Sequence, residues 1–513
     1  MSRKVASAKT AVSGIILNTI TAVLGFITQR IFISSLGVEY SGVNSVFTSV
    51  ISILTLTDLG ISTAVIFHLY KPLANRNTAK VAALMQFYHK ACRIVSGIII
   101  VGGLILLPFA PAFVGETAVN NNLYIIFGLF ITNALFSYAF NYRRPLLSAD
   151  QKGFIINYVL TAQHIVLYTA RILILLLTRN FYLYTLLTVV LKILENLTIN
   201  KIVQKRYPYI NKKTKLDTNT KTDIKKKMYG SAYHNAATYV VFSTDNIIIS
   251  QIFSVISVGL YANYFMVLNS LDLLFGQLFK SMTASLGNIL ASESVKKLYQ
   301  MTKKIMFLNF WVYAVVCIAT YFCITPFIKL WLGPDFLFSD ATVIALILNF
   351  YFQSTRLPIS SVLASAGILY ENRFVPVVEA LINLVASIAL AFLIGLPGVF
   401  IGSALSNLFL HLYSFPKYAF KLVLKRTKAE YILLFLKYFG LFIVAWIGVG
   451  GIVHFINLNN AITDFLIKGL ISVVAPSILY WLIFRKSEEF QYFAKFGKDF
   501  IKKKLAKKPR RSR

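Results

Sequence analysis

The sequence predicts an all-α integral membrane protein, and three observations support this fold class. Of the 513 residues, 57% are hydrophobic and only 14% are charged, whereas a soluble chain is about one quarter charged. Apolar runs of the roughly 20 residues needed to cross a membrane recur along almost the whole length. These runs are too long for barrel strands and do not alternate with period two, so helices are expected.

Fourteen membrane spans are expected, separated by polar loops. Their ranges are 10–34, 42–68, 82–110, 121–143, 154–178, 181–203, 229–253, 257–282, 302–326, 341–364, 374–395, 397–420, 430–455 and 462–484.

The distribution of positive charge tests this count. Alternate loops are rich in lysine and arginine, and the intervening loops nearly lack them, with Arg179 and Lys329 as exceptions. Because cytoplasmic loops collect positive charge, both termini are expected in the cytoplasm. The basic loops carry Lys71, Arg76 and Lys80; Arg143, Arg144 and Lys152; Lys296, Lys297, Lys303 and Lys304; and Lys417, Lys421, Lys425, Arg426 and Lys428.

An internal repeat divides the chain. RRPLLSADQKG (143–153) resembles TRLPISSVLASAG (355–367), and GVEYSG (37–42) resembles VGLYAN (258–263). Two six-helix bundles of parallel topology are therefore expected, with two extra C-terminal helices. The predicted parts are an N-terminal bundle at 1–203, a basic cytoplasmic linker at 204–228, a second bundle at 229–420, helices 13 and 14 within 421–485, and a basic amphipathic tail at 486–513.

The tail repeats phenylalanine at helical spacing, with lysines on the other face. A helix lying on the membrane surface is expected, which would favour anionic lipids. The net charge of +33 is interpreted in the same way, as topology and lipid contact and not nucleic-acid binding. The phenylalanines are Phe490, Phe493, Phe496 and Phe500.

Charged residues inside spans are costly and indicate function. Arginine keeps its charge when desolvated and grips phosphate oxygens with two donors, so a phosphate or pyrophosphate substrate is predicted. An aspartate is too short to reach the membrane surface and needs a partner inside. The predicted substrate-binding residues are Arg30, Asp58, Arg144, Arg171, Asp245 and Arg356.

Other polar residues in the spans have simpler interpretations. Lys192 and Glu195 are spaced to pair with each other, and Arg143 and Lys152 are explained mainly by topology. His164 and His411 are interpreted as packing residues. The sequence contains no Walker A, GxGxxG, HExxH or CxxC pattern, and Cys92, Cys317 and Cys323 lie in apolar stretches. No enzyme activity, cofactor or metal site is therefore expected.

The chain resembles the Wzx-type polysaccharide repeat-unit flippases of the MOP superfamily. The resemblance rests on FITQRIFISSLGVEYSGVNSVFTSVISILTLTDLGIS (26–62), LLSADQKGFIIN (146–157) and STDNIIISQIFSVISVGLYANY (243–264). It implies a bacterial cytoplasmic membrane protein that moves an undecaprenyl-pyrophosphate-linked oligosaccharide by alternating access. It also implies H⁺ or Na⁺ coupling, for which Asp58, Asp245, Asp272 and Glu379 are the candidates. A polysaccharide polymerase and glycosyltransferases would be its partners.

Several alternatives stay open at this stage. A drug or metabolite antiporter of the MATE type and a lipid II flippase would share the fold. A membrane polymerase or glycosyltransferase is disfavoured, because the outer loops are short and mostly uncharged. A non-transporting scaffold is disfavoured by the charges inside the spans. The sequence specifies neither the sugar, the pathway, the coupling ion nor the oligomeric state.

Overall fold

The structure is a computed structural model, which describes residues 3–55, 60–212, 214, 216–224, 243–368, 371–456 and 460–506. Within these ranges all regular secondary structure is helical, which confirms the predicted fold class. Ten of the described helical segments are long and apolar enough to cross a membrane.

The helices group into two compact units. Unit 1 comprises Met1–Met266 and Arg373–Gly402, and unit 2 comprises Val267–Asn372 and Ser403–Arg513. These units are groups of helices that contact one another most, and they are not defined by the sequence repeat. The predicted bundle boundaries therefore stay a prediction.

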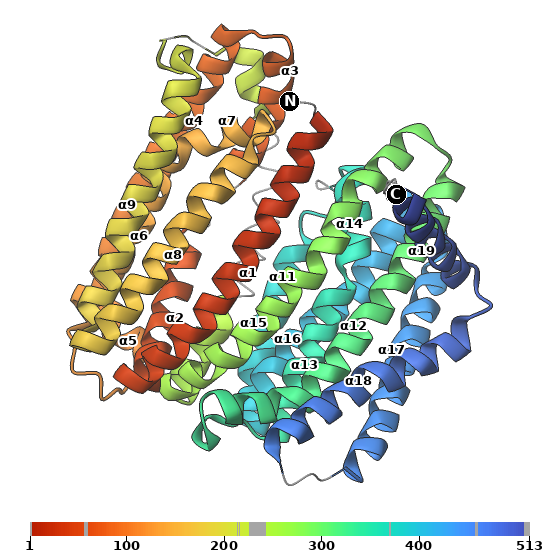
Figure 1. The fold of residues 1–513 in the computed structure, drawn as a ribbon. Helices are drawn as coiled ribbons and strands as arrows, with labels where there is room; N and C mark the ends of the chain where they lie inside the picture. The colour runs from red at the N-terminus through yellow and green to blue at the C-terminus, as the bar shows by residue number, and fades with distance from the viewer. Residues whose placement is uncertain are drawn as a thin grey trace, which may run out of the picture. The chain divides into compact units, whose positions relative to one another are not determined.

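Unit 1 contains most of the first half of the chain. Figure 1 shows α4, α6, α8 and α9 running alongside one another, with α1 against α8. Its helices are α1 (Arg3–Leu36), α2 (Val38–Leu54), α3 (Ile61–Ala74), α4 (Thr78–Leu106), α5 (Ala110–Val114), α6 (Leu123–Ala139), α7 (Arg144–Ala149), α8 (Gly153–Thr178), α9 (Phe181–Arg206), a helix over 243–252, the beginning of α11 (Val255–Ser292), α15 (Val375–Ile394) and the beginning of α16 (Leu396–Phe409).

Unit 2 is organised around α12 (Val295–Trp331), which packs against α13, α17 and α18 through aromatic rings. Phe310 stacks on Tyr438 with ring centroids 4.5 Å apart, and Tyr351 stacks on Phe442 at 4.1 Å. The predicted helices 13 and 14 thus form part of this core. The remaining helices are α13 (Asp340–Thr355), α14 (Leu357–Ala366), the π-helix η6 (Leu410–Val423), α17 (Lys428–His454), α18 (Ala461–Phe484) and α19 (Glu488–Ala506).

Polar side chains fix where many helices begin. Asn122 accepts hydrogen bonds from the amides of Tyr124 and Ile125, and Asn180 accepts one from Leu183. Such caps satisfy amides that lack a partner inside the helix. Asn77, Ser294, Ser339, Thr427 and Asn460 cap other helices in the same way.

Two predicted spans are interrupted at the same kind of sequence. The span 121–143 ends in a short 3₁₀ turn, after which α7 begins at Arg144-Pro145. The span 341–364 is divided into α13 and α14 at Arg356, with Pro358 in the first turn of α14. Proline is favoured in the first helical turn and disrupts a helix interior, so each Arg–Pro segment ends one helix and begins the next.

Two further predicted spans are described only in part. The span 42–68 becomes α2 and α3, and residues 56–59 between them lie outside the described ranges. α9 is a continuous helix that carries Lys192 and Glu195 in its interior. Most of the span 229–253 lies outside the described residues, and 243–252 is helical.

The related segments 37–42 and 258–263 pack against each other in unit 1. A Cβ atom on Gly42 would lie 2.0 Å from the carbonyl oxygen of Val255, and one on Gly259 would lie 2.3 Å from that of Val38. Only glycine permits this approach. The approach is mutual, because each glycine lies against the backbone of the helix that carries the other.

Candidate functional site: a cationic ladder along α9

A polar face winds along most of α9. Its side chains recur every fourth residue, so each lies beside the next, and the face turns by about 40° around the helix at each step. From the first to the last, 20 residues rise about 30 Å, the thickness of the hydrocarbon core. They are Tyr184, Thr188, Lys192, Asn196, Asn200 and Gln204.

Arg171 of α8 contacts the beginning of this face. Its Nη2 donates a hydrogen bond of 2.7 Å to Thr188 Oγ1. Its guanidinium carbon lies 4.3 Å from the centroid of the Tyr184 ring, a cation–π contact. The ring and the hydroxyl replace part of the hydration that an arginine inside a membrane loses.

The middle of the face holds one carboxylate and two cations. Lys192 Nζ lies 3.2 Å from both carboxylate oxygens of Glu195. Arg144 Nη2 donates to Glu195 Oε1 and, at 2.9 Å, to Asn196 Oδ1. The Glu195 side chain is 4% exposed, whereas those of Arg144 and Lys192 are 21% and 29% exposed. The carboxylate is therefore buried beneath two cations that are partly accessible.

Arg143 contacts the far end of the face. Its Nη1 donates a hydrogen bond of 3.0 Å to the carbonyl oxygen of Asn200. We call Arg171, Lys192, Arg144, Arg143 and Glu195 the α9 ladder. It contains four cations and one carboxylate, a net charge of +3 at neutral pH.

Each ladder arginine keeps an unused hydrogen-bond donor. The Nε atoms of Arg143, Arg144 and Arg171 are buried, and among the described residues they have no hydrogen-bond partner. A buried donor without a partner costs about 1–3 kcal/mol. Because these atoms are buried, an anion would reach them only if the side chains rearranged, whereas the partly exposed Arg144 and Lys192 can meet an anion such as phosphate directly.

The interpretation of Arg143, Lys192 and Glu195 from sequence was incomplete. Lys192 and Glu195 do pair, but Arg144 shares the same carboxylate. Arg143 makes a specific contact to α9 in addition to any topological role. The fourfold polar spacing on α9 was the signal that could have identified this face.

Arg356 in unit 2 has a comparable setting. Its Nη1 donates to Asn407 Oδ1 at 2.9 Å, and Asn407 Nδ2 donates to Asn349 Oδ1 at 2.9 Å. Arg144 and Arg356 thus both stand at a helix break and both donate to an asparagine. The residue before the asparagine differs between the units: Glu195 precedes Asn196 in unit 1, and Ser406 precedes Asn407 in unit 2.

Two of the predicted ion-coupling residues lie in the interior of unit 1. Asp245 and Glu379 are 6% and 7% exposed. The helices that carry them meet where Thr244 Oγ1 donates to Asn383 Oδ1 at 3.2 Å. A buried carboxylate is stable only beside a partner, in its protonated form or beside a cation.

The remaining predicted residues lie elsewhere. Arg30 is exposed on α1 and makes no hydrogen bond or ion pair within the described ranges. Asp272 accepts a hydrogen bond of 3.1 Å from Tyr313 Oη in unit 2. Asp58 lies outside the described residues. His164 and His411 are hydrogen-bonded, to Thr21 at 2.8 Å and to Tyr431 at 2.7 Å respectively.

Comparison with known proteins places this fold among transporters. Neither a protein-family model nor a curated protein sequence matches the chain. An inward-closed structure of the lipid II flippase MurJ matches with a TM-score of 0.64 and 14% identity, covering 92% of this chain and 98% of that one. An inward-facing multidrug resistance MATE transporter of the MOP superfamily matches with a TM-score of 0.60 and 12% identity, covering 77% and 94%.

A third solved structure agrees with these two. A MOP-superfamily transporter from Pyrococcus furiosus, whose binding pocket is described as reversed in polarity, matches with a TM-score of 0.57 and 12% identity, covering 83% and 98%. The chain has the MOP-type transporter fold. Ten helices in the described part of the chain are long and apolar enough to cross a membrane, so it is a multi-pass membrane protein. At this level of identity the similarity establishes the fold alone.

Proposed function

We propose that the chain is a flippase. Its substrate is an undecaprenyl-pyrophosphate-linked oligosaccharide repeat unit, which it moves across the bacterial cytoplasmic membrane for surface-polysaccharide biosynthesis. The observation that carries the proposal is the α9 ladder, which sets four cations against one buried carboxylate and leaves the side chains of Arg144 and Lys192 partly exposed.

The ladder addresses the main physical obstacle to flipping. A pyrophosphate with attached sugars cannot cross hydrocarbon unless polar groups replace its water. Arg143 Nη1 also donates to Gln204 Oε1 at 3.4 Å. From Thr188 to Gln204, the partners of the ladder are therefore spread over 16 residues of α9, or about 24 Å. An anion could pass from one arginine to the next without losing contact with a cation.

Glu195 would compete with the transported anion for the cations of the ladder. In the structure the carboxylate holds Arg144 and Lys192. A phosphate group that displaces it would gain two cations, and departure of the phosphate would restore the ion pairs. Such exchange keeps binding reversible, which transport requires.

Alternating access would then be biased by an ion. A ligand shifts a conformational equilibrium only by binding the two states differently. We propose that Asp245 and Glu379 take up H⁺ or Na⁺ in one state and not the other, with Asp58 and Asp272 as further candidates. A polymerase and glycosyltransferases would act after and before this step, with both termini of the chain in the cytoplasm.

Deletion of the gene followed by lipid analysis tests the proposal. The expected result is that the lipid-linked repeat unit accumulates on the cytoplasmic face. Expression of the wild-type chain in the deletion strain should remove this accumulation. Arg144→Gln should relieve it poorly, whereas Arg179→Gln, which removes an arginine outside the ladder, should act like wild type. Absence of accumulation in the deletion strain contradicts the proposal.

A lipid II flippase is the second candidate. The MurJ structure covers 92% of this chain, more than the 77–83% covered by the MATE-fold and P. furiosus structures cited above, and lipid II also carries a pyrophosphate. Depletion would then block cell-wall synthesis and leave surface polysaccharide intact. Growth and polymer export measured in the same depletion strain separate the two substrates.

A further inference from the structure

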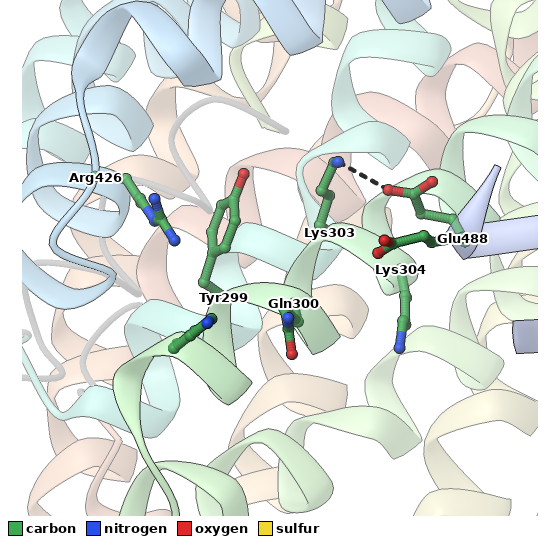
Figure 2. A pocket seen from close by; sticks show the side chains of 8 residues that line it. Tyr299, Gln300, Lys303, Lys304, Arg426 and Glu488 are labelled. Carbon is green, nitrogen blue, oxygen red and sulfur yellow. Dashed lines mark ion pairs between the residues drawn. The ribbon is translucent and has the colours of Figure 1, made fainter.

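A basic pocket of about 150 Å³ lies in unit 2. It is formed by the first turns of α12, the segment before α17 and the first turn of α19. Figure 2 shows Tyr299, Lys303 and Lys304 of α12 with Arg426 and Glu488 around it. The proposed flippase activity does not involve this pocket.

The pocket has an excess of positive charge. Four cations line it, namely Lys296, Lys303, Lys304 and Arg426, against the two carboxylates of Glu488 and Glu489. Glu489 is already engaged, since Lys303 Nζ lies 2.9 Å from its Oε1. The pocket therefore has two more cations than carboxylates, which suits an anion.

Aromatic rings hold two of the cations in place. The Arg426 guanidinium carbon lies 4.3 Å from the centroid of the Tyr299 ring, and the Tyr299 hydroxyl donates to Glu430. Lys304 Nζ lies 4.1 Å from the centroid of the Tyr492 ring. Cations ordered by cation–π contacts lose less entropy when an anion binds.

The position of the pocket indicates which anion reaches it. The span predicted at 302–326 begins beside it, and Phe490 of α19 stacks on Trp311 of α12 with centroids 5.7 Å apart. α19 has an apolar face and a lysine-rich face, as in helices that lie at the membrane surface. A pocket between the beginning of this predicted span and such a helix is expected at the depth of lipid headgroups.

We infer that this pocket binds the phosphate of an anionic phospholipid headgroup. Lys296, Lys304 and Arg426 contact the phosphate, while the pair between Lys303 and Glu489 keeps α19 beside it. The bound lipid strengthens the docking of α19 on α12. This inference does not depend on the transported substrate.

Native mass spectrometry of the full-length chain in detergent tests the inference with phosphatidylglycerol and phosphatidylcholine as probes. One phosphatidylglycerol should bind more tightly than phosphatidylcholine. Each cation beside an anionic lipid contributes about fivefold, so the double variant Lys296→Gln/Arg426→Gln should bind phosphatidylglycerol about 30-fold more weakly. Lys297→Gln is the matched control, because Lys297 pairs with Glu293 at 2.6 Å and does not line the pocket.

Three outcomes overturn the inference. If Lys297→Gln weakens phosphatidylglycerol binding as much as the double variant does, the effect comes from overall charge and not from the pocket. If phosphatidylcholine binds as tightly as phosphatidylglycerol, the pocket does not select an anionic lipid. Tighter binding of inorganic phosphate than of phosphatidylglycerol shows that the pocket takes free phosphate and not a lipid. The charge-preserving variant Lys296→Arg/Arg426→Lys should retain binding, which separates loss of the site from loss of the fold.

Discussion

Replacement of Glu195 by glutamine should destabilise the protein strongly. The carboxylate is 4% exposed and holds both Arg144 and Lys192. Its removal leaves two cations close together without a counter-charge. Loss of one partner from a fully buried ion pair costs about 3–5 kcal/mol. Because these cations are 21% and 29% exposed and so partly screened, we expect about 2–3 kcal/mol.

A double-mutant cycle isolates this interaction. Arg144→Gln/Glu195→Gln removes the charge and its partner together, so its destabilisation should fall short of the sum of the single variants by about 1–2 kcal/mol. Equilibrium unfolding in mixed dodecylmaltoside and SDS micelles measures each free energy. Glu293→Gln is the control, since its pair with Lys297 is exposed and contributes less than about 1 kcal/mol.

Two results would refute this reasoning. If Glu195→Gln unfolds within about 0.5 kcal/mol of the control, Glu195 does not hold the cations in solution. If the two losses of unfolding free energy are additive, Arg144 and Glu195 are not coupled. Glu195 would then not compete with a bound anion for Arg144, as the proposed reversible binding requires.

Three further predictions concern other parts of the chain. Arg171→Lys should lower polymer export about tenfold, since an ammonium loses the planar stacking and the fork of donors; unchanged export argues against a role for this guanidinium. Gly42→Ala should prevent stable folding, because its Cβ would lie 2.0 Å from a carbonyl oxygen of α11, whereas Gly128→Ala has open space and should purify normally. Partial burial raises the pKa of Glu489, but the Lys303 hydrogen bond and nearby lysine charges hold it below its ordinary value of 4.5. Docking of α19 should therefore be complete above pH 4.5 and weaken as the pH falls through the lowered pKa. A spin label on α19 would report this as increased mobility, and a loosening on raising the pH would have the wrong sign.

The fold could be predicted from the sequence because hydrophobicity and positive charge determine it directly. Helix ends at Asn122, Asn180 and Ser294 coincide with loop residues that cap helices well. The breaks at Arg144-Pro145 and Arg356 follow from the steric demands of proline. The sequence did not predict that Gly42 and Gly259 would pack against each other, because the close approach of two backbones depends on tertiary contacts.

The candidate site was predicted only in part. Arg144 and Arg171 were selected because arginine is costly inside a membrane, and in the structure both donate hydrogen bonds to polar side chains of α9. Arg143 and Glu195 received local explanations, because one sequence does not show which helices are neighbours. Asp245 and Glu379 were chosen separately, and their helices meet through a hydrogen bond that only the folded chain reveals.

Flipping in reconstituted vesicles tests the central claim most directly. A fluorescent undecaprenyl-pyrophosphate oligosaccharide is placed in the bilayer, and a membrane-impermeant quencher reports the fraction on each side. Wild-type chain should equilibrate it across the membrane, and Arg179→Gln should do the same. The variant Arg143→Gln/Arg144→Gln/Arg171→Gln should flip at least tenfold more slowly, provided that it elutes as folded protein. Flipping by this folded variant at the wild-type rate would contradict the account.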